Sequence, residues 1–124
     1  MPDRARMPSM PKSPPGLIAH FHEAMARFPA AQLRKTFGYP CAYVNGNMAT
    51  GLHGGAWFVR VPEDATAELL GIDGAAPFEP MPGRPMRGYT LLPASVLADV
   101  GALDRWIARA LDHVATLPPK AGTR

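Results

Sequence analysis

Large apolar residues near the start of the chain follow the spacing of an α-helix. Between residues 16 and 28 they recur every three or four positions, as Leu17, Phe21, Met25 and Phe28. Residues with this spacing lie along one side of a helix, so the pattern predicts a first helix that buries this side against a core.

Further helices are predicted in the middle and in the last third of the chain. Residues 99–117 carry the clearest helical pattern, and Asp99 stands where a side chain caps the first turn. A short helical turn is expected after Pro93. Residues 62–70 predict another short helix, because its first turn is acidic and Gly71 can end it in a left-handed conformation.

Two glycine-containing turns predict a three-stranded antiparallel segment over residues 40–61. Asn45-Gly46 is a strong signal for a two-residue hairpin turn because both residues tolerate a positive φ, and Gly54-Gly55 indicates a second tight turn. The two turns predict a register that pairs Val44 with Asn47, Tyr43 with Met48, Ala42 with Ala49, Cys41 with Thr50, Leu52 with Trp57, Gly51 with Phe58 and Thr50 with Val59.

This register predicts which face of the sheet each side chain occupies, because successive residues of a strand alternate between faces. One face is large and apolar, and we expect helices to cover it. The other face is only partly polar, and we expect an open docking patch there, with Val44 and Phe58 as interface residues. The first set is Cys41, Tyr43, Met48, Thr50, Leu52, Trp57, Val59 and Val61; the second is Ala42, Val44, Asn47, Ala49, Gly51, Phe58 and Arg60.

Residues 78–81 and 86–91 flank a Pro-Gly-Arg-Pro loop and predict a second hairpin. The order of elements is then α-β-β-β-α-β-β-α. It predicts an α+β fold of two layers, in which a single antiparallel five-stranded sheet carries helices on one face. The domain is expected to span residues 16–117, between a Pro-rich basic tail of residues 1–15 and a tail of residues 118–124, both predicted to be disordered.

Composition narrows the class of protein. The single cysteine, Cys41, cannot form an internal disulfide, and no run approaches the ~20 apolar residues of a membrane helix. With no secretory signal, a cytoplasmic location away from membranes is expected. The net charge of +3 arises in the tails, which hold five basic residues against one acid, whereas the predicted domain holds eight against nine.

The sequence contains no pattern typical of a catalytic, cofactor or metal site. Cys41 is predicted to be a buried apolar filler rather than a nucleophile. His20 and His22 diverge by about 200° on a helix and cannot share a metal ion. The chain is therefore predicted not to be an enzyme and to need no cofactor or metal.

Two groups of charged residues are candidate binding sites. Arg34 and Lys35 are the adjacent basic pair of the domain, and together with the basic tails they are candidates for a nucleic acid or an acidic partner. His53 is predicted to lie at the end of the sheet near Arg84 and Arg87, where the three residues would bind a small anion or another small molecule.

Six short segments match, in order and spacing, patches that occur in one known family. They are residues 36–39 (Thr-Phe-Gly-Tyr), 43–48 (Tyr-Val-Asn-Gly-Asn-Met), 57–61 (Trp-Phe-Val-Arg-Val), 77–79 (Pro-Phe-Glu), 86–93 (Met-Arg-Gly-Tyr, then Leu-Pro at the end) and 106–111 (Trp-Ile-Ala-Arg-Ala-Leu). Through them the chain resembles the N-terminal domain of the TfoX competence regulators. The resemblance implies a fold like that of secretion chaperones and a link to the regulation of competence rather than to a reaction.

These observations predict a non-enzymatic interaction module that binds a protein partner or a second copy of the chain. Nucleic-acid binding through the tails with Arg34 and Lys35 is the first alternative. Binding of a small anion or small molecule near His53 is the second.

Overall fold

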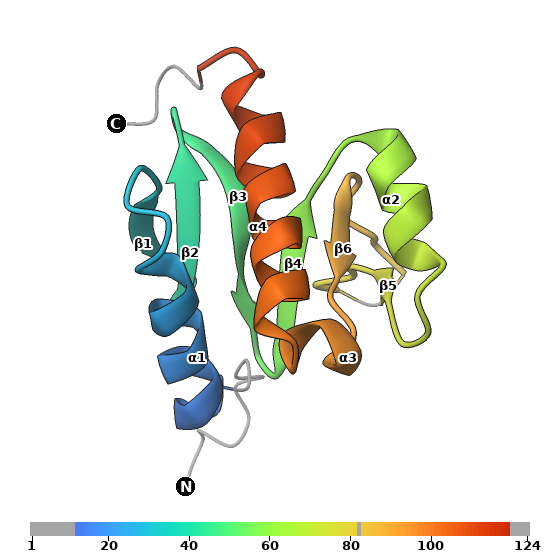
Figure 1. Ribbon diagram of the computed structural model, residues 1–124, viewed down its shortest axis with the longest axis horizontal. Helices are drawn as coiled ribbons and strands as arrows, with labels where there is room; N and C mark the ends of the chain where they lie inside the picture. Colours follow the sequence, from blue (N-terminus) through green and yellow to red (C-terminus); the bar gives the residue numbers. More distant parts are fainter. Residues whose placement is uncertain (1–11, 82, 120–124) are drawn as a thin grey trace, which may run out of the picture.

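One antiparallel sheet organises the structure, a computed structural model that describes residues 12–81 and 83–119 (Figure 1). Within these residues the strands are β1 (Gln32–Thr36), β2 (Tyr39–Val44), β3 (Asn47–His53), β4 (Ala56–Arg60), β5 (Ala76–Pro77) and β6 (Tyr89–Leu91), in the order β1-β2-β3-β4-β6-β5. The helices are α1 (Pro15–Met25), α2 (Glu63–Leu70), α3 (Ala94–Leu97) and α4 (Val100–Ala115). The predicted α+β class with a single antiparallel sheet is confirmed, but this sheet has six strands rather than five.

The additional strand is β1, at one edge of the sheet. Its sequence, Gln-Leu-Arg-Lys-Thr, has no apolar alternation, and its first four residues are exposed. It pairs with β2 alone, so it can remain polar, as edge strands often are. Because β1 buries almost no side chains, the hydrophobic pattern of the sequence could not predict this strand.

The strand predicted over residues 78–81 is wrong, and of the strand predicted over residues 86–91 only Tyr89–Leu91 is present, as β6. β6 pairs with β5 (Ala76–Pro77), whereas residues 78–81 and 83–88 are irregular, with an isolated bridge between Met81 and Arg84. Prolines at positions 80, 82 and 85 have no N–H to donate, so a regular ladder cannot continue through this segment. The backbone bonds that hold the loop include one from Phe78 N to Tyr89 O at 3.1 Å and one from Met86 N to Phe78 O at 2.8 Å.

All four helices contribute to a single buried cluster on one face of the sheet, which we call the helix-side core. In Figure 1, α4 runs across the middle strands, with α1 beside it. Trp57 lies fully buried at the centre of this core, with its ring 5.1 Å from that of Phe21. The Trp57 indole N–H donates to the Thr50 hydroxyl at 2.9 Å, and that hydroxyl donates to the Phe58 carbonyl at 2.7 Å.

The helix ends agree with the sequence patterns in most details. The Asp99 side chain accepts a hydrogen bond from Ala102 N and caps α4, and α3 is the turn expected after Pro93. Gly71, however, ends α2 with a φ of −76°, so its predicted left-handed conformation is wrong. Among the described residues no helix is long and apolar enough to cross a bilayer. The predicted disorder of residues 1–11 and 120–124 concerns positions outside the described ranges.

A bulge changes the register of the first hairpin. Val44 pairs with Asn47 and Tyr43 with Met48, as predicted, but Ala42 then pairs with Thr50 and Cys41 with Gly51. Ala49 is therefore an extra residue in β3, and the two pairs predicted for Ala42 and Cys41 are wrong. The pairs predicted for the second turn, including Leu52 with Trp57, are all confirmed.

The bulge exchanges the faces of several side chains. Tyr43, Cys41 and Met48, predicted under the helices, belong to a second cluster on the opposite face. Ala42, Val44 and Ala49, predicted on that opposite face, pack in or against the helix-side core. Trp57 and Phe58 occupy the two faces predicted for them.

Replacing Thr50 by Val is expected to lower the free energy of unfolding by about 1–3 kcal/mol, because the buried Trp57 N–H would lose its acceptor. Urea denaturation measures the change. Thr116→Val is a matched control, since the Thr116 hydroxyl bonds His113 O at the exposed end of α4, and its effect should stay within about 0.5 kcal/mol. Equal losses in the two variants would contradict the role of the Trp57–Thr50 bond.

Candidate functional site

The face of the sheet opposite the helices is not the open patch that the sequence predicted. Phe58 is on this face but only 2% exposed, because Phe78, in the loop that joins β5 to β6, packs over it together with Tyr89. The Phe78 ring stacks on the Phe58 ring, with centroids 4.5 Å apart and planes 12° apart. Tyr89 packs edge-on against Phe58. The predicted exposure of Phe58 is therefore wrong, and Val44 is half-buried on the other face.

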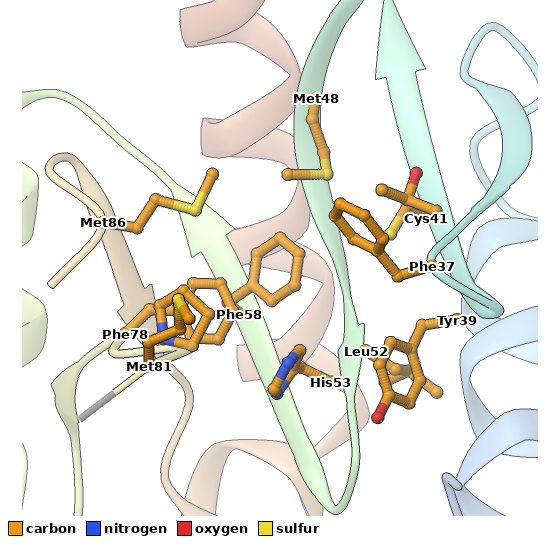
Figure 2. Close-up of a pocket in the computed structure, with 12 residues that line it drawn as sticks. Phe37, Tyr39, Cys41, Met48, Leu52, His53, Phe58, Phe78, Met81 and Met86 are labelled. Carbon is orange, nitrogen blue, oxygen red and sulfur yellow. The ribbon is translucent and has the colours of Figure 1, made fainter. Parts of the chain in front are cut away.

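Between this loop and the β1–β2 turn, the helix-free face encloses a pocket of about 330 Å³ (Figure 2). Its walls come from segments far apart in the sequence, with the β1–β2 side and the loop side facing each other across β3 and β4. The lining residues are Thr36, Phe37, Tyr39, Cys41, Met48, Leu52, His53, Phe58, Phe78, Pro80, Met81 and Met86. None of these residues is an aspartate, glutamate, lysine or arginine.

The pocket has a buried floor and an exposed apolar rim. Cys41, Phe58 and Phe78 are at most 5% exposed, whereas Phe37 is 85% exposed and Met81 is 61% exposed. Phe37 and Met81 come from opposite walls. Large apolar side chains so exposed beside an apolar cavity are typical of a binding site.

Phe37 also has an unusual backbone conformation. Its φ is +54°, followed by Gly38 at +86°, and the next hairpin turn has nearly the same geometry, with Asn45 at +52° and Gly46 at +82°. Asparagine is common in the left-handed region, whereas a bulky residue there is strained. Strain retained at an exposed aromatic residue points to a function for that side chain.

The two basic residues of β1 do not form one patch. The Arg34 guanidinium lies over the Tyr43 ring, 4.8 Å from its centroid, and so belongs to the helix-free face. Lys35 lines a separate hollow that includes Ser13, Pro15 and Ile18, on the side of α1. Adjacent residues of a strand point to opposite faces of the sheet. Arg34 and Lys35 therefore do not form the joint binding site that the sequence predicted.

His53 lies in the pocket wall rather than in a contact with arginines. Its ring is 4.9 Å from the Tyr39 ring and 5.3 Å from the Phe78 ring. Arg84 and Arg87 are exposed residues of the loop that forms the opposite wall. In the part of the chain that the structure describes, no hydrogen bond or ring contact joins either arginine to His53.

Burial disfavours the ionised form of two groups on this face, the Cys41 thiol and the Tyr89 phenol. Burial raises the pKa of the Cys41 thiol, and hydrogen bonds involving Thr36 and Leu52 offset part of this effect. Burial likewise raises the pKa of Tyr89, whose hydroxyl donates to the Met48 carbonyl at 3.1 Å. A neutral thiol is a weak nucleophile. No group of three or more His, Cys, Asp or Glu side chains within residues 12–81 and 83–119 could hold a metal ion.

Comparison with protein families gives a match to the TfoX N-terminal domain over residues 23–114. The chain belongs to the TfoX N-terminal domain family. Comparison with curated proteins and with solved structures gave no match. The region shared with the family contains all the pocket-lining residues of this TfoX N-terminal domain.

The sequence did not identify the pocket, although it contained one usable signal. A phenylalanine before glycine, in a turn where asparagine would be favoured, marked Phe37 as unusual. Phe78, Met81 and Met86 gave no comparable signal, because their position over β4 depends on the path of an irregular loop.

Phe37→Asn is expected to raise the free energy of unfolding by about 1 kcal/mol, because asparagine tolerates the left-handed conformation. Asn45→Phe provides the reciprocal control, since it places phenylalanine at the same φ in the next turn, and it should lower stability by a similar amount. Chemical denaturation compares the two variants with the parent. A loss of stability in Phe37→Asn would mean that the turn is not strained.

Cys41 is expected to react with iodoacetamide at pH 8 far more slowly than N-acetylcysteine does. Its pKa is raised and its side chain is buried, so both the thiolate fraction and access are low. Mass spectrometry follows the adduct over time, and the urea-unfolded protein is the positive control. Rapid modification of the folded protein would contradict the structural role of Cys41.

Proposed function

We propose that this TfoX N-terminal domain is a non-enzymatic interaction module of the cytoplasm, which serves regulation by docking a protein partner on its helix-free face. The observation that carries the proposal is Phe37, an exposed aromatic residue kept in a strained conformation at the rim of an apolar pocket. Met81 provides an exposed apolar contact on the opposite rim. Exposed aromatic and methionine side chains are enriched at protein interfaces.

The distribution of charge favours an acidic partner. Within the described residues, seven of the nine acids lie on helices or at the N-cap of α4. The pocket-side layer instead holds Arg34 and Arg60, whose guanidinium groups lie over the Tyr43 and Tyr89 rings, and the exposed loop residues Arg84 and Arg87. Its one acid is Glu79. Such a surface attracts acidic segments and repels basic ones.

The arrangement supports a protein partner over a nucleic acid. The nucleic-acid alternative relied on Arg34 and Lys35 binding phosphates together, but the two side chains face opposite sides of β1. The apolar side chains of the rim are also better suited to contact apolar groups of a protein than the phosphates of a nucleic acid. A second copy of the chain is a less suitable occupant, because the arginines of two such faces would oppose each other.

Photo-crosslinking from the rim tests this proposal. With p-benzoylphenylalanine in place of Phe37 or Met81, a single dominant crosslinked protein is expected in cells. Val100 is the control position, since it is 56% exposed but lies at the start of α4, and it should not give this product. Arg34→Glu, combined with the probe at position 81, should reduce the yield several-fold.

Two outcomes would overturn the proposal. If position 100 gave the same product as positions 37 and 81, the rim would have no special role. If the product were a dimer of the chain, or were lost on nuclease treatment, the occupant would be a second copy or a nucleic acid instead.

A further inference from the structure

We infer that the pocket is the anchor site for one neutral aromatic side chain of the partner, flanked by acidic residues. This inference rests on the proposed function and adds to it the chemistry that the pocket selects. It concerns the cavity itself, whereas the proposal above depends on the rim. The two can therefore be tested separately.

The size of the pocket suits one aromatic side chain. An engineered cavity of about 150 Å³ binds benzene, and this pocket of about 330 Å³ is roughly twice that volume. It lies near the lower limit of about 300 Å³ for ligand sites. A phenyl, phenol or indole group therefore fits.

The lining selects a neutral group. A charged group placed in the pocket would lose water and find no opposite charge, because the lining holds no acid, lysine or arginine. Among the lining residues Thr36, Tyr39 and His53 carry polar groups, and the Thr36 hydroxyl is hydrogen-bonded to that of Tyr43. His53 borders the cavity between Tyr39 and Phe78, where a ring nitrogen could bond an indole N–H or a phenol.

The walls favour an aromatic group over an aliphatic one. Phe58 and Phe78 already stack in parallel, and a third ring can pack on this pair edge-on or offset. Met48, Met81 and Met86 surround the space with thioether groups, which adapt to irregular shapes and make favourable contacts with rings. Figure 2 shows these methionines on both sides of the cavity.

Arginines on the segments that form the two walls favour acidic neighbours of the anchor in the partner's sequence. Arg34 lies beside the β1–β2 wall, and Arg84 and Arg87 lie in the loop that forms the other wall. Acidic residues on either side of an inserted ring would approach these groups. Their attraction is exposed to solvent, so salt should weaken it.

A capped tripeptide, acetyl-Glu-Trp-Glu-amide, tests the inference directly on the full chain with ¹³C-labelled methionine methyl groups. Binding is expected to shift the methyl signals of Met48, Met81 and Met86, which line the pocket. Met25 is the internal control, since it is buried in the helix-side core and should not shift.

Two peptide comparisons test the chemistry. Acetyl-Glu-Leu-Glu-amide should bind about 2–10-fold more weakly, which corresponds to the usual advantage of an aromatic contact. Acetyl-Lys-Trp-Lys-amide should bind several-fold more weakly at low salt, and this difference should shrink at 0.5 M NaCl, a level at which charges on a surface are strongly screened.

A pair of identical substitutions separates the pocket from general stability. Phe78→Leu removes one face of the stacked pair, whereas Phe21→Leu makes the same change in the helix-side core. The first should weaken binding of the Trp peptide at least fivefold, and the second should leave it unchanged. Where Phe78→Leu fails to fold, His53→Leu, at a half-buried site, replaces it and should weaken the Trp peptide more than the Leu peptide.

The inference is overturned if the Trp peptide shifts no pocket methionine, if Met25 shifts equally, or if the Leu peptide binds as tightly. It is also overturned if the two phenylalanine variants behave alike. None of these results would affect crosslinking from the rim. Conversely, the absence of a protein crosslink from positions 37 and 81 would reject the docking proposal. The peptide measurements would still show whether the pocket prefers an aromatic group.

Discussion

The extra residue at Ala49 determines which side chains of the sheet face the helices. Because of this bulge, Ala49 and Thr50 are both fully buried although they are neighbours in one strand. Beyond the bulge the faces are exchanged, so Met48 and Cys41 point away from the helices. Without this extra residue their side chains would lie beneath α4, and the helix-free face would lose part of its pocket wall. One local irregularity in β3 thus sets both the packing of the core and the composition of the binding face.

The second constraint is the proline content of the segment that covers this face. Residues 78–88 cannot extend the sheet as a regular hairpin, because three of them are prolines without a donor. The segment folds over β4 instead, where Phe78 stacks on Phe58. This cover buries Phe58 but leaves a cavity between the loop and the β1–β2 turn. A regular strand would have continued the sheet and left the face open and flat.

The turn that carries Phe37 links stability to function in the same region. Two adjacent hairpins use nearly identical backbone conformations, and only one of them has the residue that this conformation favours. The other holds an exposed phenylalanine beside the pocket. Membership of the TfoX N-terminal domain family is consistent with a regulatory role, and the proposed docking of a protein partner rests on this exposed apolar rim. Burial raises the pKa of both Cys41 and Tyr89 on this face.

Local patterns were sufficient for the helices, the two tight turns and the opposite orientations of Trp57 and Phe58, because periodicity and turn chemistry depend on residues close in the sequence. The family, too, could be recognised from short segments in order. The bulge at Ala49, the polar edge strand β1 and the pocket could not be read in this way. The bulge at Ala49 depends on packing beneath α4. The edge strand β1 needs no pattern of buried residues, and the pocket exists only where separate segments of the chain meet. Phe37 and Met81 are more than forty residues apart in the chain, and only the folded sheet and its covering loop place them at the rim of one site.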